Sequence, residues 1–386
     1  LDEALSIPAV IGHVRCRYLP RAALAAGLLR LALTVLGRPD RFMALLSGAE
    51  TKTLDTNRAL EALASRVRDD PTLRNLFAAH EAAELWAALE TQPSGRVFLA
   101  EIDAFLDRYG HRESAVLLAS QPTWKDAPEV VLGIVKGLST APPPPPAQPV
   151  AWDDLLAHPL LRPRPLRAAF VTLLTQARLL WQIREDTHFY ATMPLPVVRR
   201  TLLEYGRRLS KAGLLASADD VLHLKRSEIE GVWPSRSQPS SELRALVQLR
   251  KERRSALEGT PLHEPVLNRR QEFEDGPVVV RGLPGSPGLA EGPVRVILHD
   301  REFGKLRRGE VLVAPYTNPA WTPLFQRAAG VVVDSGSAGS HAAIVAREYS
   351  IPAVMATGDG TSRLRDGQMV QVDGTNGMVQ PAHPSR

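Results

Sequence analysis

The chain of 386 residues contains a single cysteine, Cys16. One cysteine excludes an internal disulfide and a zinc site built from several cysteines, and it is typical of a reducing compartment such as the cytoplasm. We expect this thiol to be buried and inert. A hydrophobic fraction of 44% is ordinary for a soluble globular protein, and the length is sufficient for two or three domains.

Long apolar runs and clusters of like charge are also missing. The most apolar segment, residues 22–37, has the sequence AALAAGLLRLALTVLG and carries Arg30 at its centre. Because a bilayer span needs ~20 apolar residues, this segment predicts a buried or interfacial helix, and no signal peptide is recognisable. The net charge of +5 comes from scattered arginines and does not indicate nucleic-acid binding. We therefore expect a cytoplasmic protein that binds neither nucleic acid nor membranes.

Two phosphate-binding motifs are absent as well. The sequence contains neither GxxxxGK[ST] nor GxGxxG following a predicted strand, so no nucleotide site of its own is recognisable, and no metal site is predicted.

Apolar residues recur at helical spacing from residue 1 to about residue 276, which predicts a mostly α-helical region. In residues 76–90 the predicted buried stripe consists of Leu76, Ala79, Ala83 and Trp86. In residues 97–110 it consists of Phe98, Ile102 and Phe105, and Gly110 is expected to end that helix in the left-handed conformation.

Two further segments of this region have distinct patterns. The proline-rich stretch 140–150 forbids a helix and predicts a stiff linker or a surface loop. Residues 213–230, GLLASADDVLHLKRSEIE, predict a helix, a turn, a short strand and a second helix.

The pattern changes between residues 276 and 281. Glycine and proline become frequent, and short β-branched runs such as PVRVIL, EVLVAP, GVVVD and MVQVDG follow one another. We therefore predict a multidomain α+β protein, in which a helical region (1–276) precedes a compact β/β/α domain (277–386).

One stretch of the second domain combines a strand, a loop of small residues and a helix. Ser340 is the predicted N-cap of the helix HAAIVAREY, and His341 lies in its first turn. The backbone N–H groups and dipole of a helix N-terminus favour an anion, and small residues leave those groups accessible. The same dipole disfavours an imidazolium, so His341 is a candidate nucleophile towards phosphorus. The alternative is a structural histidine at a helix start.

Residues 336–354, GSAGSHAAIVAREYSIPAV, resemble the phosphohistidine segment of the swivelling domain in phosphoenolpyruvate-utilising enzymes, which include phosphoenolpyruvate synthase, pyruvate phosphate dikinase and rifampicin phosphotransferase. The resemblance covers roughly residues 280–380. It implies that His341 is phosphorylated from ATP and that the whole domain swings between a donor site and an acceptor site. Those families often carry two adjacent glycines and a threonine near the histidine, whereas serines stand at positions 337 and 340 here.

The candidate phosphate-binding residues lie on both sides of His341; they are Gly336, Ser337, Gly339, Ser340 and Arg347. For Arg347, six residues beyond the histidine, a structural ion pair or a packing role is the alternative.

Residues of the helical region resemble the central acceptor-binding domain of rifampicin phosphotransferase-type proteins, notably FLDRYGHRES and QPTWKDAPEVVLGIVKGL. The resemblance makes His111 a candidate base towards an acceptor hydroxyl, Arg112 a phosphate clamp and Trp124 part of an apolar acceptor pocket. The alternatives are a helix cap for the first two and an ordinary core residue for Trp124.

In those families an ATP-grasp domain precedes the acceptor domain, and residue 1 begins beyond where it would lie. We therefore expect a C-terminal part of a longer chain, or a subunit that receives ATP and Mg²⁺ chemistry from an ATP-grasp partner. The predicted function is a phosphotransferase that passes a phosphoryl group from ATP through His341 to a small-molecule acceptor of unknown identity. The alternatives are a non-catalytic carrier or binding protein, and a natural-product ligation enzyme of the same architecture.

Overall fold

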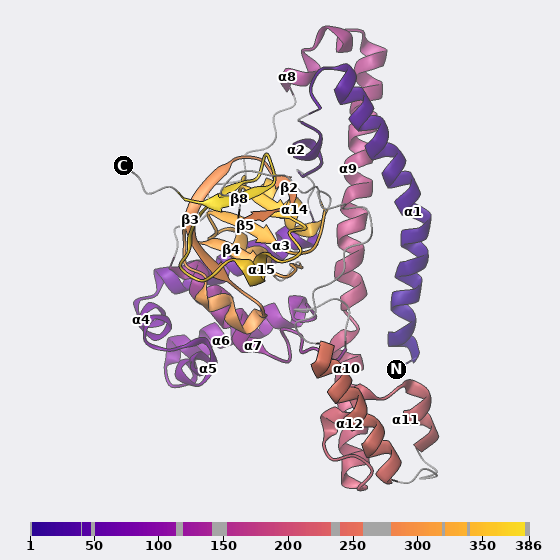
Figure 1. The fold of residues 1–386 in the computed structure, drawn as a ribbon, viewed down its shortest axis with the longest axis vertical. Helices are drawn as coiled ribbons and strands as arrows, with labels where there is room; N and C mark the ends of the chain where they lie inside the picture. The colour runs from indigo at the N-terminus through magenta and orange to yellow at the C-terminus, as the bar shows by residue number, and fades with distance from the viewer. Residues whose placement is uncertain are drawn as a thin grey trace.

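The computed structural model describes residues 2–39, 41–47, 51–112, 119–140, 153–232, 240–257, 279–318, 321–337 and 340–382. A helical region is followed by a domain built on a mixed β-sheet, as predicted (Figure 1). The predicted linker at 140–150, apart from its first residue, and the predicted domain boundary at residue 276 lie outside the described residues.

The longest helices, α1 (Asp2–Val35) and α9 (Arg164–Thr192), pack against each other along their lengths (Figure 1). Their shared core includes Leu29, Leu33 and Leu174, none of which is exposed. Only one face of residues 22–37 is buried, since Leu24 and Leu31 on the other face are exposed. The helix α1 also extends beyond the apolar run: its segment Val10–Val35 is long and apolar enough to cross a membrane, and only 17% of that stretch is buried. The prediction of a buried thiol is wrong, because Cys16 lies on the exposed side of α1.

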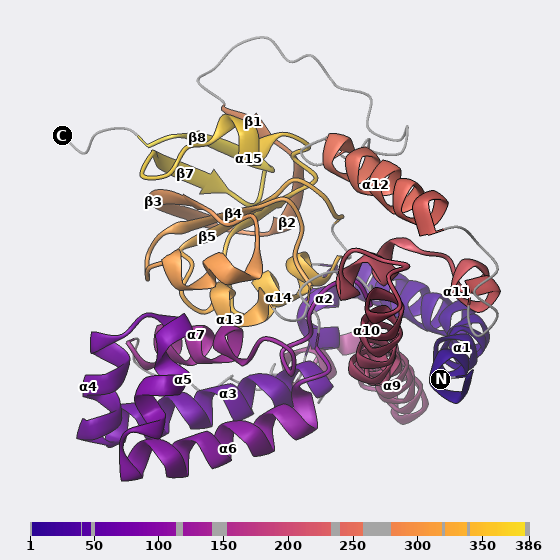
Figure 2. The same cartoon turned by 90° about the horizontal axis from the view of Figure 1, so that it is seen from below.

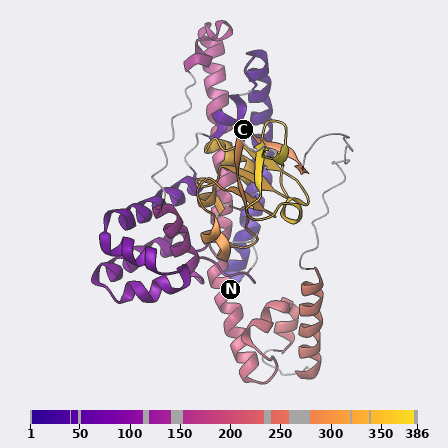
Figure 3. The same ribbon diagram turned by 60° about the vertical axis from the view of Figure 1, so that its left-hand side comes forward.

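Five helices form a separate bundle beside this pair (Figure 3); they are α3 (Lys52–Asp69), α4 (Pro71–Ala79), α5 (Ala82–Glu90), α6 (Pro93–Tyr109) and α7 (Pro128–Ser139). The continuous stripe predicted for residues 76–90 is wrong, because the chain breaks between α4 and α5. The Glu84 carboxylate accepts a hydrogen bond from the Glu81 N–H (3.4 Å) and starts a new helix. The buried positions are therefore Leu73, Phe77, Leu85 and Leu89.

The stripe predicted for α6 is confirmed, since Phe98, Ile102 and Phe105 are all buried. Its C-terminal residue differs from the expectation: Gly110 has φ −67° and is right-handed. Glycine is needed there for space, because a Cβ would lie 2.2 Å from the Leu106 carbonyl oxygen.

The remaining helical elements are short or lie at the two ends of the α1–α9 pair; they are α2 (Arg41–Ser47), α8 (Asp153–Leu156), η1 (Pro159–Leu161), α10 (Leu195–Lys211), η2 (Ala218–His223), α11 (Arg226–Val232) and α12 (Ser240–Leu257). The short strand predicted within residues 213–230 is wrong. Ser217 and Asp220 form a capping box that winds this segment into the 3₁₀ helix η2, and Lys251 of α12 pairs with Asp220.

The second domain contains one eight-stranded sheet in the order β1-β8-β7-β3-β4-β5-β6-β2. The strands are β1 (Val280–Arg281), β2 (Leu283–Ser286), β3 (Leu289–Val296), β4 (Val311–Ala314), β5 (Gly330–Val333), β6 (Ala353–Met355), β7 (Met369–Asp373) and β8 (Met378–Pro381). Strands β3 to β6 are parallel, and the outer pairs are antiparallel. Only Gly282 separates the two edge strands β1 and β2, so the sheet curls until its edges meet; a Cβ there would lie 2.3 Å from the Met355 carbonyl oxygen.

Side chains of the central strands alternate between two cores, as the period of two requires. Val332 of β5 faces the interior of the curled sheet, where it packs among other valines. Val331 and Val333 face outwards, beneath η3 (Asp300–Lys305), α13 (Thr322–Phe325) and α14 (His341–Glu348). These helices lie between the sheet and the helical region (Figure 2).

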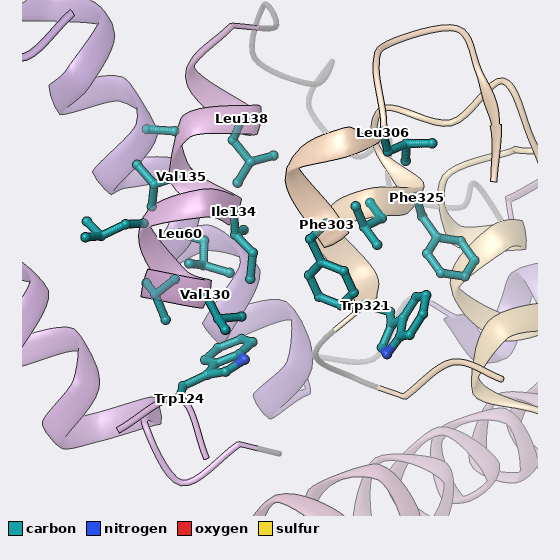
Figure 4. Close-up of a cluster of buried hydrophobic side chains, with 14 of the residues drawn as sticks. Leu60, Trp124, Val130, Ile134, Val135, Leu138, Phe303, Leu306, Trp321 and Phe325 are labelled. Carbon is teal, nitrogen blue, oxygen red and sulfur yellow. The ribbon is translucent and has the colours of Figure 1, made fainter. Parts of the chain in front are cut away.

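One hydrophobic core therefore runs through both domains. Figure 4 shows Ile134 and Leu138 of α7 opposite Phe303 of η3 and Phe325 of α13, and all four side chains are buried. Arg327 follows α13 and lies against α7 at Gly137, where its guanidinium donates to the Phe303 carbonyl oxygen (2.7 Å). Burial lowers the pKa of Arg327 to about 10.

We predict that Gly137→Ala weakens the contact between the domains. A Cβ at this position would lie 1.7 Å from Arg327 Nη1, and the buried guanidinium can move only by losing its bond to Phe303. Overpacking of this kind costs about 1–3 kcal/mol. Chemical denaturation of the whole chain measures the loss. The control is Gly27→Ala in α1, where a Cβ meets nothing within 4 Å and should raise helix stability; equal effects at the two positions would contradict the prediction.

Candidate functional site

The loop before α14 is anchored by the residue that follows β5. The carboxylate of Asp334 accepts hydrogen bonds from Thr357 Oγ1 (2.8 Å), the Thr361 backbone N–H (3.1 Å) and the Thr361 hydroxyl. Ser335 Oγ donates to the Pro315 carbonyl oxygen (2.9 Å). These bonds fix the start of the loop relative to the ends of β4 and β6.

Small residues shape the rest of the loop. Gly336 has φ +111°, a region that favours glycine, and a Cβ there would lie 3.0 Å from Ser340 Oγ. Ser337 is exposed, and its carbonyl oxygen accepts from the Ser340 N–H (2.9 Å). Ser340 is the N-cap of α14, with its hydroxyl accepting from the Ala343 N–H (3.5 Å), as predicted. Gly339 lies outside the described residues.

His341 is the first residue of α14, and its imidazole is half-buried. Its Nε2 lies 3.2 Å from Thr322 Oγ1 on the neighbouring helix α13. The threonine hydroxyl either donates to the Nε2 lone pair or accepts from an Nε2–H group, and in both cases the bond fixes the plane of the ring. Thr322 is fully buried, so this partner is held rigidly.

The other end of α14 carries Arg347 and, just beyond it, Tyr349. Arg347 lies in the last turn, about 9 Å along the helix axis from His341 at 1.5 Å per residue. Burial lowers the pKa of its guanidinium. Tyr349 accepts hydrogen bonds at its hydroxyl from Asn57 Nδ2 of α3 (3.2 Å) and from Gln326 Nε2 (3.0 Å).

His111 lies in the helical region, two residues beyond the end of α6, and only 6% of it is exposed. Its ring packs nearly perpendicular to the ring of Phe189, with centroids 4.4 Å apart. Burial and the adjacent Arg112 charge lower the pKa of His111 to about 4, although a backbone hydrogen bond with Phe189 acts in the opposite direction. The imidazole is therefore neutral at pH 7, and its Nε2 has no hydrogen-bond partner among the described residues.

Arg112 is equally buried and connects the segment after α6 to the start of α3. Its Nη2 donates to the Lys52 carbonyl oxygen (3.2 Å) and to Thr56 Oγ1 (3.0 Å). The guanidinium also lies over the Phe189 ring, 5.6 Å from its centroid. A structural role is thus visible for this residue, and Thr56 is the immediate neighbour of Asn57, which binds Tyr349 of the β-sheet domain.

Trp124 is buried in the core of the bundle, where it stacks on Phe105 with centroids 6.1 Å apart. Figure 4 shows it at the edge of the contact between the domains, near Val130. The structure therefore brings Ser340 and His341 together at one end of α14, and it places Arg112 next to the helix α3 that contacts the other end. Whether the predicted residues bind phosphate or acceptor stays a prediction.

Comparison with known proteins assigns both parts of this arrangement. Residues 306–377 match the family described as PEP-utilising enzyme, mobile domain. The chain contains this mobile domain. Residues 17–185 of the helical region match the rifampicin phosphotransferase fourth domain.

The relatives extend the homology over most of the chain. The chain is 32% identical to chondramide synthase of Chondromyces crocatus over 87% of its own length and 10% of that protein. It is 29% identical to the rifampicin phosphotransferase of Streptomyces sviceus over 87% of this chain and 40% of the relative. With the phosphoenolpyruvate synthase of Aeropyrum pernix it shares 50% identity over 27% of this chain and 13% of the relative. The chain thus spans less than half of the length of these relatives.

Three residues at the site were not predicted from the sequence: Thr322, Asn57 and Tyr349. Thr322 precedes Pro323 at the start of a short helix, a local signal for an N-terminal turn but not for a partner 19 residues away. Asn57 and Tyr349 are 292 residues apart, so no periodicity connects them.

We predict that His111 makes the stability of the chain pH-dependent. Its pKa is about 4 in the folded chain and 6.5 in the unfolded chain, so its contribution is complete above pH 6.5 and is lost as the pH falls towards 4. Between pH 7 and pH 5 this amounts to about 2 kcal/mol. His111→Gln should remove that part of the pH dependence in urea unfolding, whereas the exposed His13→Gln should not. Parallel curves for wild type and His111→Gln would contradict the assignment.

Proposed function

We propose that this chain is the carrier and acceptor part of a phosphotransferase, and that His341 carries the phosphoryl group. The observation that carries the proposal is the position of His341 at the N-terminus of α14, capped by Ser340 and oriented by Thr322, within the mobile domain. The N-terminus of a helix stabilises the negative charge of a phosphoryl group.

The proposed reaction has two transfers. In the first, the lone pair of an imidazole nitrogen attacks phosphorus, and an N–P bond forms as the P–O bond to the leaving group of the donor breaks. In the second, an acceptor oxygen attacks the same phosphorus, the N–P bond breaks, and a base takes the acceptor proton. His111 is the proposed base, since its low pKa keeps the imidazole neutral and able to accept a proton at pH 7.

In this proposal the donor is ATP, bound with Mg²⁺ on an ATP-grasp domain or subunit, as the family resemblance implies. Among the described residues no group of three or more His, Cys, Asp or Glu side chains is arranged as a metal site.

The proposed cycle places a requirement on the donor side. When the mobile domain leaves the helical region, it uncovers Phe303, Leu306 and Phe325, which are now buried against α7. Leaving such a side chain in water costs roughly 1.5–3 kcal/mol. A donor domain that covers the same side chains offsets that cost and makes the movement reversible.

A second candidate function is natural-product assembly through a phosphorylated intermediate. The similarity to chondramide synthase over 87% of the chain favours it. The two candidates share the first transfer and differ in the product, a stable phosphorylated acceptor in one and a ligated compound with free phosphate in the other.

The test uses ATP labelled at the β-phosphate, with a separately supplied ATP-grasp donor. We expect acid-labile, base-stable label on the wild-type chain and none on His341→Ala. His80→Ala, which removes a half-buried histidine outside the site, should keep the label. Equal labelling of wild type and His341→Ala would show that the carrier is another residue. Absence of label from wild type, both with the labelled ATP and with ³²P-labelled phosphoramidate as a chemical donor, would favour a non-catalytic carrier or binding protein.

A further inference from the structure

The helix that begins with His341 is held at both ends by a single neighbouring helix. Thr322, the first residue of α13, contacts His341 Nε2 at 3.2 Å. Gln326, one turn later and directly after α13, donates to the hydroxyl of Tyr349 at 3.0 Å. The two bonds bracket α14, because His341 starts the helix and Tyr349 follows its last residue.

Two helices of the helical region contact α14: α2 packs against it, and α3 reaches the residue after it through a hydrogen bond. Asn57 of α3 donates its Nδ2–H to the same Tyr349 hydroxyl at 3.2 Å, and Asn57 is only 7% exposed. The oxygen of Tyr349 therefore accepts hydrogen bonds from both domains at once. On the helical side, the neighbouring Thr56 accepts from Arg112, so the donor side chain sits on a fixed part of α3.

We infer that Tyr349 is a positioning residue that couples docking of the mobile domain on α3 to the orientation of the His341 ring. The inference rests on the proposed role of His341 as phosphoryl carrier. When Asn57 holds Tyr349, Gln326 and α13 are fixed with it, and Thr322 then fixes the ring; when the domain leaves α3, one of the two donors to Tyr349 is lost.

Two physical properties make this coupling effective. All four residues of α13 are buried and Pro323 stiffens its first turn, so the helix moves as one body. The apolar contact between the domains has no preferred direction, whereas a hydrogen bond to a hydroxyl depends on angle as well as distance. The bonds of Tyr349 therefore set the register in which α14 docks.

The first experiment measures docking in the whole chain by amide hydrogen exchange of α3 and α7. Tyr349→Phe removes only the hydroxyl, and Asn57→Ala removes the side-chain amide that donates from α3. The usual net contribution of a hydrogen bond predicts a roughly two- to tenfold increase in exchange through undocking for each. Since both changes remove the same bond, the double variant should not exceed Tyr349→Phe. The matched control is Tyr205→Phe, a half-buried tyrosine of α10 that packs in another core.

The second experiment observes the His341 ring by ¹⁵N imidazole NMR, with its signals identified by their loss in His341→Ala. Thr322→Val supplies the signals of a ring that lacks the bond to the Thr322 hydroxyl. We expect Asn57→Ala to move the His341 signals towards those of Thr322→Val, although Asn57 lies in the other domain. Tyr205→Phe should leave the signals at their wild-type positions.

Two results would overturn the inference. If amide exchange in Tyr349→Phe and in Asn57→Ala is as slow as in wild type, the hydrogen bonds of Tyr349 do not stabilise the docked position of the mobile domain. Faster exchange with unchanged His341 signals would show that Tyr349 is a docking contact without coupling to the ring. Neither readout requires phosphate, so failure of His341 to take up label refutes the proposed function independently of this result.

Discussion

The apolar contact between α7 and the helices η3 and α13 is the interaction on which the rest of this structure depends. It merges the core of the helical bundle with the outer core of the β-sheet domain, so that Ile134 and Phe303 belong to one cluster. A contact of this kind supplies free energy without direction. The relative orientation of the two domains then depends on directed interactions. The Arg327 guanidinium lies against Gly137. The hydroxyl of Tyr349 accepts hydrogen bonds from Asn57 and Gln326.

This arrangement explains how α14, a helix of only eight residues, can hold the candidate nucleophile in a fixed position within the mobile domain. One face of α14 belongs to the shared core, with Ala342, Ala343, Val345 and Ala346 buried in it. Its N-terminus is shaped by the loop after β5, in which glycine and serine leave the backbone accessible. His341 therefore lies between the buried core and the accessible N-terminus of α14, and its partner Thr322 belongs to the core.

The neighbouring residues His111 and Arg112 are buried in the same environment. Both lie against Phe189, and the permanent charge of the arginine adds to burial in keeping the histidine neutral. The arginine itself is bonded to the start of α3. A group that holds α3 in place thus also adds to burial in lowering the pKa of the candidate base.

Local patterns in the sequence determined much of the fold. Consecutive valines and their period of two predicted the central strands, small residues before an apolar helical pattern predicted the capped start of α14, and the stripe in α6 predicted its buried face. Two predictions that depended on the tertiary environment were wrong. Cys16 is exposed because a different face of α1 packs on α9. Within residues 213–230 a 3₁₀ helix replaces the predicted strand because Ser217 and Asp220 form a capping box.

What the sequence by itself determined is the nature and local setting of the candidate nucleophile, since an N-cap and a loop of small residues act over a few positions of the chain. Only the tertiary structure decided its partners. Thr322 reaches His341 from another helix on the same face of the sheet, and Asn57 reaches Tyr349 from another domain. Such contacts arise from how cores close in space, and residues that are 19 or 292 positions apart share no local pattern from which the contact could be predicted.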